Sequence, residues 1–81
     1  MKLNENEIVL LKEALSYLVS LEQSEISTFN SYLNWERQKK RPNKEIVNMN
    51  EKFIIKYQVK IKELNDLKSK LDKLLDDNLD D

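Results

Sequence analysis

The chain contains one strong helix breaker. Its 81 residues include no glycine and a single proline, Pro42, close to the midpoint. Proline removes a backbone donor and disfavours helical geometry at the preceding residue, here Arg41. Long helical patterns flank this point on both sides. The sequence therefore predicts an all-α fold, a long antiparallel hairpin of two helices of about 35 residues joined by a turn at residues 41–43.

The first helix is predicted over residues 5–40. Asn4 and Glu7 have the spacing of a capping box, in which each side chain accepts a hydrogen bond from a backbone N–H of the other. Apolar residues then recur at steps of three and four, which is the period of one helix face. That face carries Ile8, Leu11, Leu15, Leu18, Glu22, Ile26, Phe29 and Leu33, and a second stripe beside it carries Leu10, Ala14, Tyr17, Leu21, Thr28, Tyr32 and Trp35.

A run of small polar residues weakens the middle of this helix. From Ser20 to Ser31 the hydroxyl and amide side chains compete for backbone hydrogen bonds, which lowers helix propensity. A break between Ser20 and Ser24 would give three helices, and this arrangement is the alternative. We prefer a continuous helix because the apolar period runs through the segment without proline or glycine.

The second helix is predicted over residues 44–79, with Asn43 as its cap. Its apolar face carries Ile46, Met49, Asn50, Phe53, Ile54, Tyr57, Ile61, Leu64, Leu67, Leu71, Leu74 and Leu75. Folding the chain about residues 41 and 42 places Ile8 beside Leu75, Phe29 beside Ile54 and Ile26 beside Tyr57. The same register places Glu22 opposite Ile61, where the flanking Lys60 and Lys62 offer it a partner.

The predicted hairpin has more apolar surface than one helix pair can bury. The second stripe of the first helix would stay in water, and an apolar surface of this size is unusual on a small monomer. We therefore expect a single domain, residues 1–81, that dimerises into a four-helix bundle. The expected dimer interface consists of Leu10, Ala14, Tyr17, Leu21 and Thr28.

The composition argues against catalysis. The chain has no histidine, cysteine or glycine, so it lacks the usual general base, thiolate nucleophile, common metal ligands and phosphate-binding loops. Glu22 and Glu25 have no histidine to complete a bundle metal site. We expect no enzyme activity, no catalytic or metal site and no cofactor.

Charge is distributed unevenly along the chain. Residues 37–62 contain nine basic and two acidic residues, residues 1–36 contain two basic and six acidic ones, and residues 63–81 contain three basic and seven acidic ones. The turn of the hairpin is therefore basic and its open end acidic. The candidate partner-binding residues gather at the turn: Tyr32, Trp35, Arg37, Lys39, Lys40, Arg41 and Lys44.

Two functional hypotheses follow. The first is a small non-enzymatic protein-interaction module, a regulator or inhibitor that binds a larger protein. The alternative is nucleic-acid or nucleotide binding through the basic turn. The polar N-terminus and the absence of a long apolar run predict a cytoplasmic protein with no membrane partner. Twelve lysines against two arginines, with nine asparagines, are typical of AT-rich coding sequence, as in low-GC bacteria, their phages and mobile elements.

Overall fold

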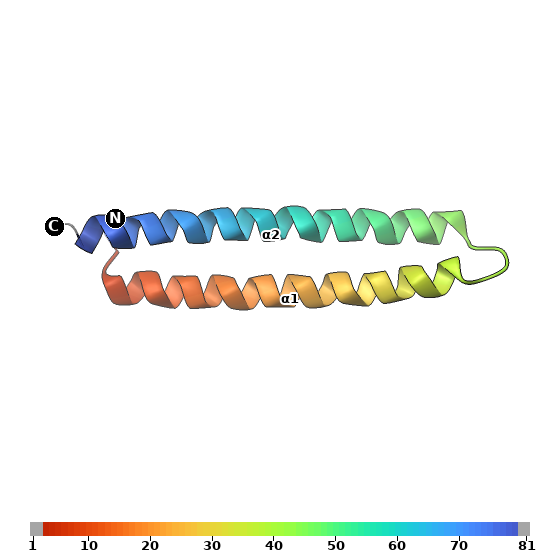
Figure 1. Ribbon diagram of the computed structural model, residues 1–81, viewed down its shortest axis with the longest axis horizontal. Coiled ribbons are helices and arrows are strands. Elements are labelled where there is room, and N and C mark those ends of the chain that lie inside the picture. Colours follow the sequence, from red (N-terminus) through yellow and green to blue (C-terminus); the bar gives the residue numbers. More distant parts are fainter. Residues whose placement is uncertain (1–2, 80–81) are drawn as a thin grey trace.

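The computed structural model describes residues 3–79, which form two antiparallel helices. α1 spans Glu5–Arg37 and α2 spans Lys44–Leu79, and the two lie side by side along their length (Figure 1). The hairpin is a rod with extents of 64 × 17 × 14 Å. The predicted all-α helical hairpin is confirmed. One boundary is wrong, because α1 ends at Arg37 and not near residue 40.

α1 is continuous through the segment rich in serine, so the three-helix alternative is wrong. Thr28 Oγ1 donates to the carbonyl of Ser24, and Ser31 Oγ donates to the carbonyl of Ser27, both at 3.1 Å. These bonds run back one turn along the helix. The hydroxyl groups are thereby satisfied without interrupting the backbone ladder.

Both predicted N-terminal caps are present. Asn4 Oδ1 accepts from the Glu7 backbone N–H at 2.8 Å, and Glu7 Oε1 accepts from the Asn4 backbone N–H at 3.0 Å. At the start of α2, Asn43 Oδ1 accepts from the backbone N–H groups of Glu45 and Ile46, at 3.0 and 3.4 Å. Each cap supplies acceptors for donors that the first helical turn leaves unpaired.

The contact between the helices follows a strict seven-residue repeat. In α1 the buried and half-buried side chains recur at alternating steps of four and three: Ile8, Lys12, Leu15, Val19, Glu22, Ile26, Phe29, Leu33 and Glu36. The matching row of α2 is Val47, Asn50, Ile54, Tyr57, Ile61, Leu64, Lys68, Leu71 and Leu75. A mean spacing of 3.5 residues is the repeat of a left-handed coiled coil. We call these two rows the seam.

The predicted face of α1 is wrong at two positions. Leu18 is 39% exposed whereas its neighbour Val19 is 9% exposed, and Leu11 is exposed whereas Lys12 is half-buried. In α2, the predicted face likewise includes residues that the structure exposes: Ile46, Met49, Phe53, Leu67 and Leu74. The reason is geometric, because the neighbouring row has the same seven-residue repeat and a similar apolar content, so the pattern does not fix the rotation of each helix about its axis.

The predicted register is confirmed to within about one helical turn. Ile8, Leu15 and Leu71 form a buried cluster, and Leu75 packs against it together with Leu3 and Leu64. Toward the turn, the Phe29 ring stacks on Phe53 and on Tyr57, with centroid distances of 5.1 and 5.8 Å. The core is therefore aliphatic near the termini and aromatic nearer the turn.

Candidate functional site

The seam divides the exposed surface of the hairpin into two different sides. On one side, the row of each helix that borders the seam is mostly apolar: Leu11, Leu18, Glu25 and Tyr32 in α1, and Ile46, Phe53, Lys60, Leu67 and Leu74 in α2. These rows follow from the helical period of 3.6 residues once the seam is fixed. We call this surface the apolar side, and Ala14, Leu21, Thr28 and Trp35 flank it on α1.

The opposite side is polar. Its rows carry Val9, Ser16, Gln23, Asn30 and Arg37 in α1, and Glu51, Gln58, Asn65 and Asp72 in α2. Two ion pairs link the helices here, between Arg37 and Glu51 at 2.5 Å and between Lys12 and Asp72. We call this surface the polar side. The hairpin is thus amphipathic as a whole, beyond the amphipathic character of each helix.

The predicted dimer-interface residues occupy two adjacent rows on the exposed surface of α1. Ala14, Leu21 and Thr28 are exposed along the edge of the apolar side. Leu10 and Tyr17 are also exposed, but they lie on the back of α1, nearly opposite the seam. The two rows adjoin, because Leu10 and Ala14, like Tyr17 and Leu21, are four residues apart on α1. Self-association itself stays a prediction.

A groove of about 310 Å³ lies on the apolar side next to the turn, and we call it the tip groove. It is lined by Tyr32, Trp35, Glu36 and Lys39 from α1 and by Ile46, Met49 and Asn50 from α2. Trp35 is 64% exposed, and the Lys39 ammonium lies 4.1 Å from the centre of its ring, in a cation–π contact. A second hollow, lined by Val9, Lys12, Glu13 and Ser16, is a furrow on α1 alone.

Glu36 holds the turn together beneath this groove. It is only 2% exposed, yet its carboxylate accepts from the Asn43 backbone N–H at 2.9 Å and pairs with the Lys39 ammonium at 2.7 Å. The hydrogen bond from Lys39, followed by that from Asn43, holds the pKa of Glu36 below its ordinary value despite the opposing effect of burial. Because Asn43 caps α2, Glu36 connects the end of α1 to the start of α2.

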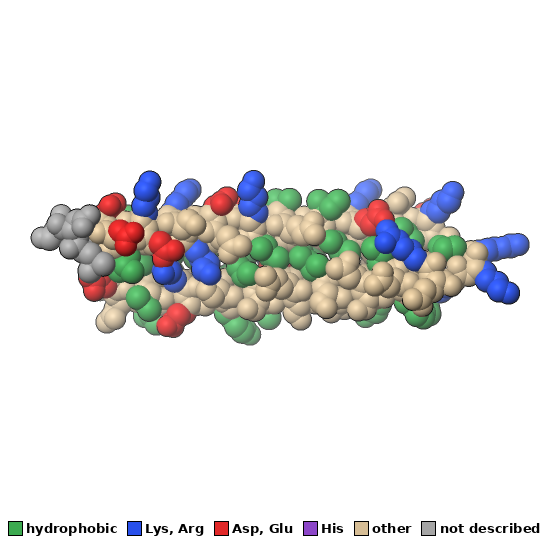
Figure 2. All heavy atoms as spheres, viewed as in Figure 1, with side chains coloured by type: hydrophobic (Ala, Val, Ile, Leu, Met, Phe, Trp, Pro, Cys, Tyr) green, Lys and Arg blue, Asp and Glu red, His purple; other side chains and the backbone are tan. Residues whose placement is uncertain are grey.

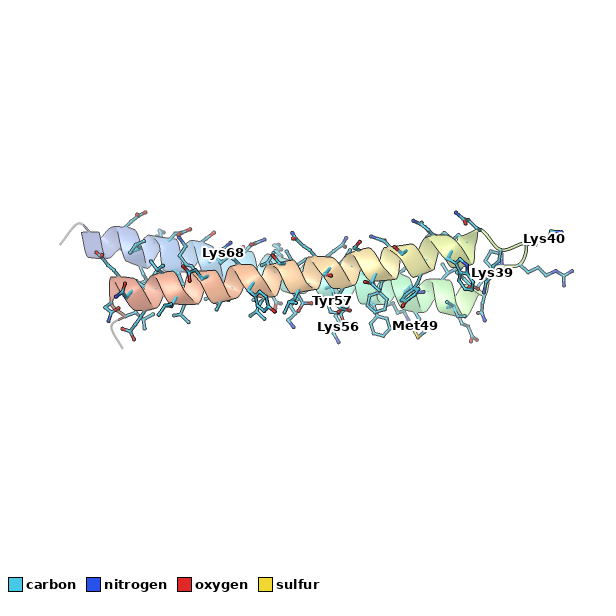
Figure 3. The ribbon with its side chains drawn as sticks, turned by 90° about the horizontal axis from the view of Figure 1, so that it is seen from below. Lys39, Lys40, Met49, Lys56, Tyr57 and Lys68 are labelled. Atoms are coloured by element: carbon cyan, nitrogen blue, oxygen red, sulfur yellow. The ribbon has the colours of Figure 1, made fainter. Side chains whose placement is uncertain are left out.

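The predicted basic residues of the turn divide into two groups. Arg37 pairs with Glu51, and Lys39 pairs with Glu36 and covers Trp35, so both are engaged within the hairpin. Within the described part of the chain, Lys40, Arg41 and Lys44 are exposed and make no ion pair. Basic side chains project from the turn in Figure 2, and Figure 3 shows Lys40 pointing outward there.

A charged group interrupts the seam midway along the rod. Glu22 is buried, and its Oε1 accepts from the Lys60 ammonium at 3.0 Å, so Lys60 is the one of the two predicted lysines that pairs with it. Glu22 Oε2 is the buried side-chain oxygen without a hydrogen-bond partner among the described residues. Lys60 reaches Glu22 from the apolar side, so the middle of that side is charged.

The structure thus brings together Tyr32, Trp35 and Lys39 of the predicted set, and adds Ile46 and Met49 to them. Figure 3 shows Met49 projecting from the edge of the hairpin. The sequence prediction did not include Glu36, although Glu36 follows Phe29 by seven residues and Glu22 by fourteen, which was an available signal. Lys40, Arg41 and Lys44 lie outside the groove, on and after the turn.

Neither described helix has an apolar stretch long enough to span a membrane, and residues 3–79 contain no cluster of acidic residues placed to hold a metal ion. Comparison of the sequence and the fold with protein-family models, curated proteins and solved structures found no match.

Proposed function

We propose that this chain is a small non-enzymatic protein-interaction module, a regulator or inhibitor that acts by binding another protein through its apolar side. The observation that carries the proposal is the contrast between the two sides of one hairpin. Large apolar side chains line most of one side of the rod, apart from its charged middle, and the other side carries mainly amides, hydroxyls and ion pairs, with Val9 and, at its edge, Ile55 exposed. An exposed apolar surface of this extent marks an interaction site in a small protein.

The tip groove gives this surface its strongest anchors. Tryptophan and tyrosine are enriched among the residues that dominate binding energy, because they bury much area at little entropic cost. Trp35 and Tyr32 stand exposed on one helix, with Met49 opposite them on the other. A helix that packs into the groove would find aromatic contacts along its apolar stripe and Lys39 at its edge.

Photo-crosslinking in the cells that encode the chain tests this proposal. A photoreactive amino acid at Tyr32 probes the apolar side, and the same amino acid at Asn30, which is also exposed, probes the polar side as a matched control. We expect a protein adduct from position 32 and none from position 30. Equal labelling from both positions, or none from either, would contradict the proposal.

Substitution tests the anchors separately. Trp35→Ala or Tyr32→Ala should each weaken the complex by more than about 1 kcal/mol, because buried aromatic anchors lose at least that much on truncation. Tyr17→Ala serves as the control, since Tyr17 is exposed on the back of α1. If Tyr17→Ala weakened binding as much as Trp35→Ala, the apolar side would not be the binding surface.

A second candidate function is binding of nucleic acid or a nucleotide at the turn. The observation that favours it is the cluster of Lys40, Arg41 and Lys44, exposed and without ion pairs among the described residues. Such binding should weaken steeply with salt, because cations on the protein release counterions from phosphate. The engagement of Arg37 and Lys39 inside the hairpin leaves this candidate weaker than the sequence suggested.

Fluorescence anisotropy of labelled single- and double-stranded oligonucleotides measures this directly. The variant Lys40→Ala/Arg41→Ala/Lys44→Ala should lose binding, whereas Lys62→Ala/Lys70→Ala/Lys73→Ala removes the same charge from exposed positions away from the turn and should retain it. No change in anisotropy for the wild-type protein at low salt would exclude nucleic acid as the ligand.

A further inference from the structure

We propose that the occupant of the apolar side is a second copy of this chain, packed antiparallel so that the two turns lie at opposite ends of a four-helix bundle. The inference rests on the proposed function, since it names the partner of the same surface. It also assigns the contact to the rows that border the seam, and it leaves Leu10 and Tyr17 outside the contact.

The accessible surface of the hairpin matches the requirement of a dimer. The chain exposes 6624 Å², whereas a compact monomer of 9.7 kDa would expose about 5,100 Å². If dimerisation buried that excess of about 1,500 Å² of accessible surface on each copy, the interface would bury about 3,000 Å² in total. This total is within the range of permanent homodimers.

The pattern of the apolar side fits a bundle of four helices. A helix in such a bundle contacts two neighbours, so it needs the seam rows and one bordering row to be apolar. α1 and α2 both have this pattern, and in both helices the apolar bordering row lies on the same side of the hairpin. Two copies can therefore stack face to face, with the polar sides outward.

Charge decides the orientation. Parallel stacking would bring the free Lys40, Arg41 and Lys44 of two turns together, and the acidic open ends of both copies together. Antiparallel stacking instead places each basic turn beside the open end of the other copy, where Glu5, Glu7, Asp76 and Asp77 are exposed. Opposite charges in contact favour this arrangement, and like charges disfavour the other.

Side-chain size favours the same orientation. Nearer the turn, the apolar side carries Tyr32, Trp35 and Phe53, whereas nearer the termini it carries smaller residues such as Leu11 and Ala14. Antiparallel packing sets the large side chains of one copy against the small ones of the other, which is how facing layers fill space evenly. In the dimer, the turn of one copy would lie beside the open end of the other, and Figure 3 shows both ends of one hairpin.

Molar mass in solution tests the second copy. Sedimentation should give twice the 9.7 kDa of one chain for the wild-type protein. Leu18→Lys/Tyr32→Lys should raise the dimer dissociation constant by about 100-fold or more, at about tenfold for each anchor lost. Gln23→Lys/Asn30→Lys adds the same charge to the polar side and should change the constant by less than about threefold.

Circular dichroism shows whether each variant is still helical, so a loss of association can be told apart from a loss of folding. All four substituted positions are exposed in the hairpin, so we expect both variants to fold. A monomeric wild type, or equal weakening by the two double variants, would overturn the proposal.

Energy transfer tests the orientation. The chain has no cysteine, so Asn6→Cys at the open end and Lys40→Cys at the turn each give one labelling site, and both sites are exposed. Mixed dimers should show efficient transfer between labels at Asn6→Cys and Lys40→Cys, and little between two Lys40→Cys labels, which would lie near opposite ends of a 64 Å rod. Efficient transfer between two turns would overturn the antiparallel arrangement.

The crosslinking experiment keeps this inference distinguishable from the proposed function. An adduct from position 32 with a second copy alone supports the dimer and overturns a different protein as the occupant of the apolar side. An adduct with a different protein, from a chain that is monomeric when purified, overturns the second copy and leaves the interaction module standing. No adduct from either side, with a monomeric chain, overturns both.

Discussion

The two halves of the hairpin are held together by different forces. Near the termini, the seam is aliphatic, with Ile8, Leu15 and Leu71 at the centre of the buried cluster. From the middle of the rod to the turn, the seam contains the three buried polar residues of the described chain, Glu22, Glu36 and Asn50. Apolar burial responds little to protonation, whereas hydrogen-bonded carboxylates depend on pH and on their partners. The half that carries the tip groove is therefore the half whose stability depends on pH and on the partners of its carboxylates.

The aliphatic half should show the largest effect of a single truncation. Leu15→Ala removes a side chain from the buried cluster and should lower the free energy of unfolding by about 2–4 kcal/mol, from lost burial and the cavity left behind. Urea unfolding followed by circular dichroism measures this. Leu18→Ala is the matched control, because Leu18 lies one turn away but is exposed, and in dilute monomer it should cost less than about 1 kcal/mol. Equal losses would place Leu18 in the core.

Glu22 and Lys60 allow the polar half to be weakened and strengthened at one point. Lys60→Ala leaves the Glu22 carboxylate buried without its partner and should cost about 1–2 kcal/mol, less than for a fully buried pair because Lys60 is half exposed. Glu22→Leu restores an apolar residue to the seven-residue repeat and should stabilise the hairpin by about 1–2 kcal/mol. The same urea titration measures both variants. A loss of stability in Glu22→Leu would show that the charge contributes more than the burial of leucine would.

The gross architecture could be predicted because its determinants are local. Pro42 prevents one helix from running through the midpoint, and Asn4, Glu7 and Asn43 cap helices within four residues of their own positions. The pairing of Glu22 with Lys60 also followed, since one turn of known position fixes the register of two straight helices. None of these inferences required knowing which face of each helix turns toward its partner.

The seam could not be predicted in full because it depends on that rotation. Leu18 and Val19 are adjacent, both are apolar, and both continue a pattern of threes and fours. The observed row contains Lys12 and ends in Glu36, so it looks less apolar than the predicted row with Leu11 and Leu18. The role of Glu36 was not predicted for a related reason. Its carboxylate accepts a hydrogen bond from the Asn43 backbone N–H, seven residues away across the turn. Both rows fit a strict seven-residue spacing, so the spacing alone does not tell which of them faces α2.

Acid should weaken the polar half first. The pKa of Glu36 is lowered in the folded hairpin by Lys39 and by the Asn43 N–H, so the ionised form stabilises the fold. This contribution is present above the ordinary pKa of about 4.5 and is lost as the pH falls through the lower, folded-state value. Glu36→Gln keeps an acceptor for Asn43 but removes the charge. The difference in free energy of unfolding between wild type and Glu36→Gln should therefore shrink on acidification.

Hydrogen exchange locates that effect. Backbone amides of residues 43–46 should lose protection in Glu36→Gln at neutral pH, whereas amides around Leu15 and Leu71 should be unaffected by the substitution. A difference between wild type and Glu36→Gln that stayed constant from neutral to acidic pH would mean that the carboxylate charge does not hold the turn.

The smallest effects belong to the exposed ion pairs, one in each half. A double-mutant cycle on Arg37 and Glu51, near the turn, should give a coupling of about 0.2–1 kcal/mol, because water screens both side chains. The pair of Lys12 and Asp72, in the aliphatic half, should give a value in the same range. Both couplings should fall in high salt. Similar coupling energies for the two ion pairs would mean that the halves differ in their buried polar groups. A clearly larger coupling between Arg37 and Glu51 would mean that surface charge also stabilises the turn.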